Sequence, residues 1–277
     1  MINLIRAEML KAQKNTVVTV FTLGTLPALA FALLNMLAIL GAIGLWVTDI
    51  TRVNPQEQVI LALLFANQFL AQGLIVIFTA VMFGGESRWN TWKNILPRNH
   101  RSQIVLSKFI LIAIAILLST QLMALLTFIG SWEVATFTNV PFVNEAWGDS
   151  GHRFATQYLW ASFAISLNLM IAAIYTGIVT IQTQSISTGI VIGLIVTFAD
   201  SLAQLAFSLI SGLLRIDFIA AIPDFLPNKN IQNILSWITG GDTIYHRSLS
   251  VSTLIILIWI ICGIGLSIYL FERRDIH

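Results

Sequence analysis

Six long apolar stretches constrain the fold of this chain more than any other feature of its sequence. They cover residues 17–46, 59–83, 104–130, 154–181, 186–210 and 251–271. A helix needs about 20 mostly apolar residues to cross the hydrocarbon core of a bilayer, and each stretch reaches that length. Outer-membrane barrel strands are only about 10 residues long and alternate in polarity. The sequence therefore predicts an all-α integral membrane protein with six transmembrane helices.

Composition agrees with a membrane protein and excludes several other classes. Hydrophobic residues make up 57% of the chain, above the roughly 45–50% of soluble domains. The net charge of +2 gives no sign of a nucleic-acid partner. Cys262 is the single cysteine, which excludes a disulfide framework. We expect one transmembrane permease domain over residues 1–277.

The basic residues predict the orientation of the helices. If the N-terminus lies inside, the inner segments hold roughly ten lysines and arginines and the outer ones roughly five, as the positive-inside rule requires. Both termini are then cytoplasmic, in a multi-pass protein of the cell (inner or plasma) membrane. The outer segment 212–250 is apolar but broken by Pro223 and Pro227. We expect a re-entrant or interfacial hairpin there, before the sixth span.

The inner segment 84–108 concentrates charge in a chain of which only 10% is charged. On a helix beginning at Glu86, the side chains of Trp89, Trp92 and Leu96 share one face, and polar residues occupy the other. Such a helix lies along the inner membrane surface. Two interpretations remain open: an ordinary positive-inside loop with aromatic anchors, or a polar face that docks in a groove of a partner protein.

The residues of this segment resemble a known pattern. Together with IRAEMLK at positions 5–11, the chain is similar to permease subunits of type-2 ATP-binding-cassette (ABC) exporters, closest to the lantibiotic-immunity and bacitracin-type branch. One departure is Asn90, where the family usually has glycine. The pattern consists of Glu86, Thr91, Trp92, Lys93, Leu96, Pro97, Arg101 and Lys108.

The resemblance implies specific roles. Residues 1–16 would form an N-terminal interfacial helix, and 86–97 the coupling helix that sits in a cleft of a separate ATPase subunit. Residues that hold the membrane surface through anionic headgroups would be Arg98, Arg101 and Lys108. Residues that couple to the ATPase would be Glu86, Trp89, Thr91, Trp92, Lys93 and Leu96.

The expected partners and cofactors follow from the same resemblance. They are ABC ATPase subunits, a second permease chain (identical or homologous) and membrane lipid. ATP and Mg would be bound by the ATPase, since the chain contains no G-x4-G-K-[ST] to cradle a phosphate. No catalytic residue is expected. The four histidines are far apart in loops, so no metal site is expected either.

Polar residues inside the spans are candidates for a pathway lining. Gln68 and Gln72 lie on the second span, and Asp200 and Gln204 on the fifth. Interhelical hydrogen bonding that merely holds the bundle together is the alternative, and we favour it for the amides. A charged side chain inside the bilayer costs free energy, so for Asp200 we favour a functional role over a structural one. Glycines at 189 and 193 with Thr197 and Ser201 form a small-residue stripe that admits a close neighbouring helix.

Three functions remain after this reasoning. The first is the membrane subunit of an ATP-driven exporter, for which the resemblance implies an amphipathic substrate such as an antimicrobial peptide, a lipid or a hydrophobic drug. The second is a secondary transporter coupled to an ion gradient through Asp200. The third is a membrane scaffold that transports nothing.

Overall fold

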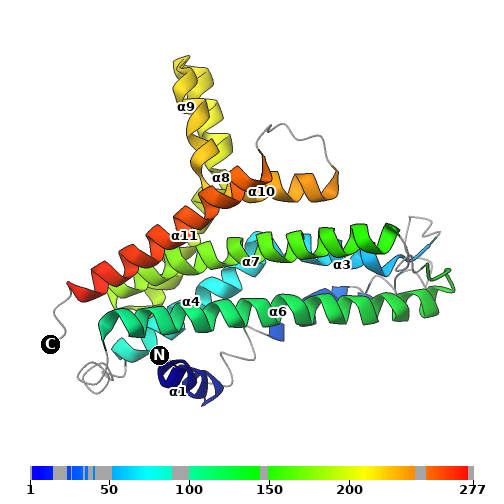
Figure 1. The fold of residues 1–277 in the computed structure, drawn as a ribbon, viewed down its shortest axis with the longest axis horizontal. Coiled ribbons are helices and arrows are strands. Elements are labelled where there is room, and N and C mark those ends of the chain that lie inside the picture. The colour runs from blue at the N-terminus through cyan, green and yellow to red at the C-terminus, as the bar shows by residue number, and fades with distance from the viewer. Residues whose placement is uncertain are drawn as a thin grey trace.

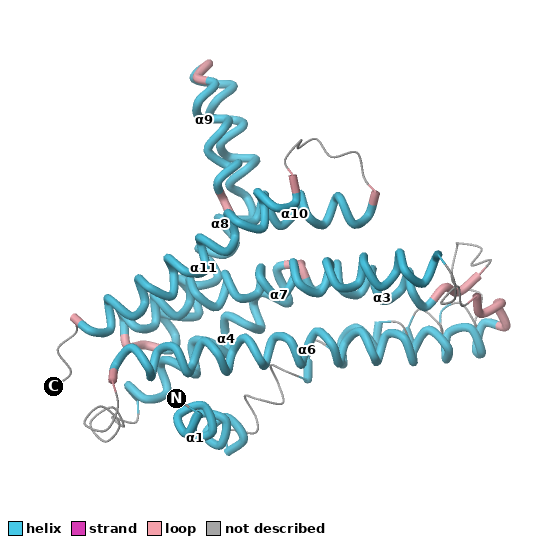
Figure 2. Tube along the Cα trace, viewed as in Figure 1, coloured by secondary structure: helices cyan, strands magenta, loops and turns pink. Residues whose placement is uncertain are grey.

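The structure is a computed structural model of the full chain. It describes residues 2–14, 24–25, 27–33, 35–36, 40, 52–88, 100–143, 149–240 and 248–273. Every secondary-structure element in these ranges is helical apart from one isolated β-bridge, as Figures 1 and 2 show. The prediction of an all-α protein is confirmed for this part of the chain.

Five of the described helices are long and apolar enough to cross a membrane. They are α4 (Phe69–Arg88), α6 (Arg101–Thr138), α7 (Asp149–Thr183), α8 (Ile186–Leu214) and α11 (Leu249–Glu272). The first expected span, 17–46, falls mostly outside the described residues, so the sixth crossing stays a prediction. In Figure 1 α1 (Ile2–Lys14) lies toward the end of the bundle where α4 ends. Helix α3 (Pro55–Ala66) begins at the opposite end of the bundle.

Helix α7 forms the centre of the bundle. It contacts α3, α4, α6, α8, α10 (Pro227–Thr239) and α11. Its inward residues, among them Ile165 and Leu169, are fully buried. Burial of this apolar surface inside the bundle leaves the outward faces of α8 and α11 to the lipid, and both helices expose large apolar side chains such as Leu205 and Ile261.

The second expected span is not one continuous helix. The prediction of a single helix over 59–83 is wrong, because α3 ends at Ala66 and α4 begins at Phe69. The Asn67 N–H donates to the Leu64 carbonyl and the Gln68 N–H to the Phe65 carbonyl, both three residues back, so the chain tightens and leaves the α-helical path. Interrupted backbone at membrane depth needs polar partners. Here the side chain of Asn168 on α7 donates to the Asn67 side chain at 2.7 Å.

Helix α8 leaves the bundle half-way along its length. Its first half follows α4, and the ring of Phe198 contacts that of Phe69 at a centroid distance of 5.5 Å. Beyond that level the helix stands away from the bundle together with the short α9 (Asp217–Ala221) (Figure 1). The outer half of α8 is apolar and exposed, and Leu213 reaches 82% exposure.

The segment 212–250, expected as a re-entrant or interfacial hairpin, contains α9, a 3-10 turn (Ile222–Phe225) and α10. Helix α10 places three asparagines in buried positions, of which Asn233 donates to the Ser252 hydroxyl on α11 at 2.8 Å. The Gln157 amide on α7 donates to the carbonyl of Ile238 at 3.0 Å. These bonds hold α10 against the bundle.

Candidate functional site

Four helix ends meet at one end of the bundle, which we call the basal end. They are α1, the last turn of α4, the first turns of α6 and the last turn of α11. The basal end therefore includes the start of the expected coupling helix, 86–97, whose first three residues form the end of α4, and also the start of α6, which follows it. Residues 89–99 lie outside the described part of the chain.

Two glutamates and two lysines form an ion network at the basal end. The Lys108 ammonium on α6 lies 3.0 Å from a Glu8 carboxylate oxygen on α1 and 3.2 Å from a Glu86 oxygen on α4. The Lys11 ammonium lies 2.7 Å from Glu8 and 2.7 Å from Glu86. The opposite formal charges balance, and the network joins α1 to α4 and α6 through pairs that are 75 and 100 residues apart in sequence.

Burial makes this network different from a surface salt bridge. The side chains of Lys108, Glu8 and Glu86 are 1%, 2% and 8% exposed. Removing ions from water costs several kcal/mol each, which only close pairing with further hydrogen bonds offsets. Lys108 has such bonds, because it also donates to the carbonyl of Met82 at 2.8 Å and lies over the Phe83 ring.

The electrostatics of α1 follow from this arrangement. Burial raises the pKa of the Glu8 carboxyl, but the charge of Lys108 and the hydrogen bond and charge of Lys11 outweigh it, so the pKa lies below its usual value. Burial lowers the pKa of Lys11, but Glu86 and Glu8 outweigh it, so that pKa lies above its usual value. Both groups are ionised at neutral pH, and α1 is held by charge.

The structure changes the expected roles of three basal residues. Glu86 was predicted to begin a new helix, but it lies in the last turn of α4. There its carboxylate binds the ammonium groups of Lys11 and Lys108. Lys108 was expected to hold headgroups, but its ammonium is enclosed within the protein. Arg101 donates to the carbonyls of Phe271 and Glu272 at 3.2 and 2.9 Å.

The Arg101 contact has a simple physical basis. The last carbonyls of a helix have no partner within it, and cations at that terminus also interact favourably with the helix dipole. Arg101 at the start of α6 thus binds the end of α11. The remaining coupling and anchoring residues fall outside the described part of the chain, so the roles predicted for them stay predictions; they are Trp89, Thr91, Trp92, Lys93, Leu96 and Arg98.

The structure places the four expected pathway residues in different surroundings. Gln68 is exposed at the α3–α4 break, but Gln72 is 3% exposed and donates to the Asn67 carbonyl at 3.1 Å. Gln204 on α8 is partly buried. Gln72 thus binds the backbone within its own expected span, Gln68 faces outward, and the pathway role of the amides stays a prediction.

Asp200 has a partner that the sequence did not reveal. It lies two residues beyond Phe198, where α8 leaves the bundle, and accepts a hydrogen bond from the backbone N–H of Asn228 in the first turn of α10. The Asn228 side chain also reaches the Ser201 carbonyl at 3.5 Å. A carboxylate at a helix N-terminus satisfies a backbone donor and complements the helix dipole. Asp200 therefore fastens α10 to α8.

The small-residue stripe on α8 serves packing within the chain. A Cβ added at Gly193 would lie 2.6 Å from the Thr176 hydroxyl of α7 and 3.1 Å from Val76 of α4. Gly189 likewise faces Thr180 of α7. The close approach expected from the stripe occurs, and the neighbours are α7 and α4 of the same chain.

Sequence reasoning missed Glu8 and Lys11 as functional candidates. Their spacing of three places opposite charges on one face of a short N-terminal helix, which was a usable signal. What it could not show is the third partner, because Lys108 is 100 residues away along the chain. No group of three or more histidine, cysteine, aspartate or glutamate residues in the described ranges could hold a metal ion.

Comparison with known proteins gives one finding. A family model described as "ABC-2 family transporter protein" matches residues 4–200, which include α1, the ion network and most of the expected spans. No curated protein matches the chain.

Proposed function

This chain belongs to the ABC-2 transporter family, whose members are membrane components of ABC transporters, and from that premise we propose that it is the permease subunit of an ATP-driven exporter. A separate ATPase would bind ATP and Mg²⁺ and act on the basal end, which would face the cytoplasm. The substrate would be amphipathic: an antimicrobial peptide, a lipid or a hydrophobic drug. The lantibiotic-immunity and bacitracin-type branch remains the expected subgroup.

The observation that carries this proposal is the ion network. Glu86 is the first residue of the expected coupling helix, 86–97, and Lys108 follows that helix in the sequence. Glu86 binds Lys11 of α1, Lys108 binds Glu8 of α1, and Glu86 and Lys108 lie 3.2 Å apart. Movement imposed on that segment by a motor protein has to be transmitted by rigid contacts. The network supplies such contacts, because displacing α4 relative to α6 would separate buried opposite charges.

The second partner we propose is another permease chain. The outer half of α8 exposes a row of large apolar side chains, including Leu205, Leu209 and Leu213, and stands clear of its own bundle (Figure 1). A helix in that position makes few contacts within one chain. A second copy packed beside it would enclose a pathway between the two protomers.

Asp200 bears on the choice between an exporter and a secondary transporter. A carboxylate that couples an ion gradient has to exchange its ion or proton during each cycle. Asp200 instead interacts with the backbone N–H of Asn228 in the first turn of α10, which gives it a packing role that needs no ion gradient. We therefore propose the exporter first and keep the secondary transporter as the alternative.

Tryptophan substitutions at the two ends of the bundle test the proposal. Trp92→Ala changes a residue expected to couple to the ATPase and leaves the four residues of the ion network unchanged, and Trp132→Ala is the matched control, because Trp132 is 61% exposed near the opposite end of α6. We expect Trp92→Ala to lose co-purification with the cognate ATPase and its stimulated ATP hydrolysis, while Trp132→Ala retains both. Normal assembly of Trp92→Ala, or transport that follows an ion gradient without ATP, would contradict the proposal.

A further inference from the structure

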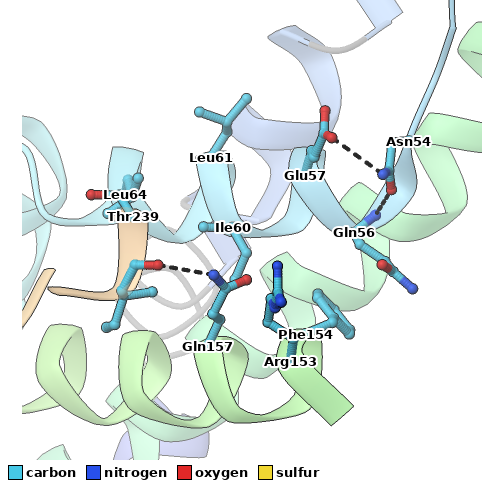
Figure 3. A pocket seen from close by; sticks show the side chains of 11 residues that line it. Asn54, Gln56, Glu57, Ile60, Leu61, Leu64, Arg153, Phe154, Gln157 and Thr239 are labelled. Carbon is cyan, nitrogen blue, oxygen red and sulfur yellow. Dashed lines mark hydrogen bonds between the residues drawn. The ribbon is translucent and has the colours of Figure 1, made fainter. Parts of the chain in front are cut away.

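A pocket opens at the end of the bundle opposite the ion network. Its volume is about 460 Å³, within the usual range for small-molecule sites of about 300–1,000 Å³. Three helices line it: α3 from its N-cap Asn54 to Leu64, the first turns of α7 and the last turn of α10. Figure 3 shows Arg153, Phe154 and Gln157 rising from α7 toward the helix that carries Gln56 and Ile60.

One part of this pocket is rich in hydrogen-bond donors. The Gln56 side-chain nitrogen is buried, and among the described residues it has no hydrogen-bond partner, although Gln56 is only 8% exposed. Arg153 is exposed at the rim, and no described carboxylate pairs with it. A buried amide donor without a partner costs free energy that an oxygen atom of a ligand would recover.

The charges around these donors favour an anionic group. Glu57 also lines the pocket, but its carboxylate lies 3.6 Å from Arg52 and accepts from the Asn54 amide at 3.3 Å, so a cation and a donor already offset it. Arg153 therefore remains as an uncompensated positive charge among the described residues. The N-terminus of the 12-residue α3 adds a further positive potential.

The other part of the pocket is apolar and lies further along α3. Leu61 and Leu64 follow Gln56 toward the α3–α4 break at Asn67, and Leu64 lies about 12 Å from Gln56 along the helix axis at 1.5 Å per residue. Phe154 and Ile238 complete this apolar lining. Along α3, the hydrogen-bond donors come first and the apolar side chains follow. A phospholipid in one leaflet has the same order of headgroup and acyl chain.

We propose that this pocket binds a phospholipid of the adjacent leaflet, with the phosphate held by Arg153 and Gln56 and one acyl chain along Leu61 and Leu64. A soluble phosphate would use the donors and leave the apolar lining in contact with water. A neutral hydrophobic molecule would leave the Gln56 amide and Arg153 without partners. The site is separate from the basal end and does not depend on the identity of the transported substrate.

Lipid titration of the purified full-length protein, followed by native mass spectrometry, tests this inference. The probes are phosphatidylglycerol, phosphatidylethanolamine and, as the soluble alternative, inorganic phosphate. Arg153→Gln removes the charge at the site, and Arg215→Gln is the matched control, because Arg215 is an exposed arginine outside the pocket. We expect Arg153→Gln to weaken binding of both lipids about tenfold, since it replaces a charge-assisted hydrogen bond, and Arg215→Gln to leave it unchanged.

A second variant separates the acyl chain from the phosphate. Leu61→Trp fills the apolar part and preserves folding, because Leu61 is 57% exposed; we expect it to weaken lipid binding without any change in charge. Competition by inorganic phosphate as effective as that by lipid would overturn the lipid assignment. Equal lipid binding by Arg153→Gln and Arg215→Gln, or normal binding by Leu61→Trp, would overturn the site itself.

Discussion

The substitution Lys108→Met probes the basal ion network most directly. Methionine keeps the apolar stem but removes the ammonium that lies within 3.2 Å of both Glu8 and Glu86. Those carboxylates are 2% and 8% exposed, and both would lose a buried cation while keeping Lys11, whose side chain is 45% exposed. Removing one partner of a buried ion pair costs about 3–5 kcal/mol, and we expect a loss of unfolding free energy in that range.

A comparison with Lys11→Met sets the scale of this loss. In that variant Glu8 and Glu86 keep the buried Lys108, and solvent already screens the half-exposed Lys11. We therefore expect a cost of about 1 kcal/mol or less, as for an exposed pair. Denaturant unfolding in mixed micelles, monitored by tryptophan fluorescence, measures both values.

The double variant Glu8→Gln with Lys108→Met tests whether the loss is electrostatic. Neutralising Glu8 removes one of the two carboxylates that Lys108→Met leaves without its main partner. We expect the double variant to be more stable than the sum of the single changes predicts, with a coupling energy of about 0.5–3 kcal/mol. Additive single changes, or equal costs for Lys108→Met and Lys11→Met, would refute the reasoning.

Three further predictions concern pH, α10 and helix packing. Because the pKa of Glu8 lies below 4.5 and that of Lys11 above 10.5, the stability they contribute is present between those values; it is lost as pH falls through the folded pKa of Glu8 or rises through that of Lys11. Glu8→Gln should flatten the acidic limb of stability against pH, and an unchanged limb would contradict the network. Asp200→Leu should increase hydrogen exchange in α10, while Asp200→Asn, which keeps an acceptor oxygen, should preserve its protection; equal protection in both would return Asp200 to the transport hypotheses. Gly193→Ala should destabilise by about 1–3 kcal/mol through overpacking, whereas Gly212→Ala, with open space around it, should stabilise by about 0.5–1 kcal/mol, and a thermal-melting comparison in which both behave alike would refute the packing account.

The α3–α4 break shows where periodicity stops being informative. Apolar runs flank the pair Asn67–Gln68, with no proline or glycine at the interruption, so length and hydropathy predicted one helix. Two side chains bind Asn67 at the break: Gln72 donates to its backbone carbonyl at 3.1 Å, and Asn168, which is 101 residues away, donates to its side chain at 2.7 Å. A hydrogen-bond partner that only folding brings near leaves no local signal.

For Asp200, too, the sequence did not reveal the partner of the side chain. Its depth in an apolar helix marked it as unusual, because an isolated charge in hydrocarbon is costly. The identity of the group that satisfies it, an N–H in the first turn of α10, depends on how the segment after α8 packs back. The sequence located the residue, and the structure supplied its role in holding α10.

By itself, the sequence determined that this protein is helical and lies in a membrane, since apolar runs of spanning length have few other stable solutions. It also located the charged segment between the second and third spans and the stripe that lets α8 approach its neighbours. The tertiary structure alone decided that Glu86 and Lys108 meet Glu8 and Lys11 in one buried network. Hydropathy depends on each residue and its neighbours along the chain, whereas an ion pair depends on which helix ends the fold brings together.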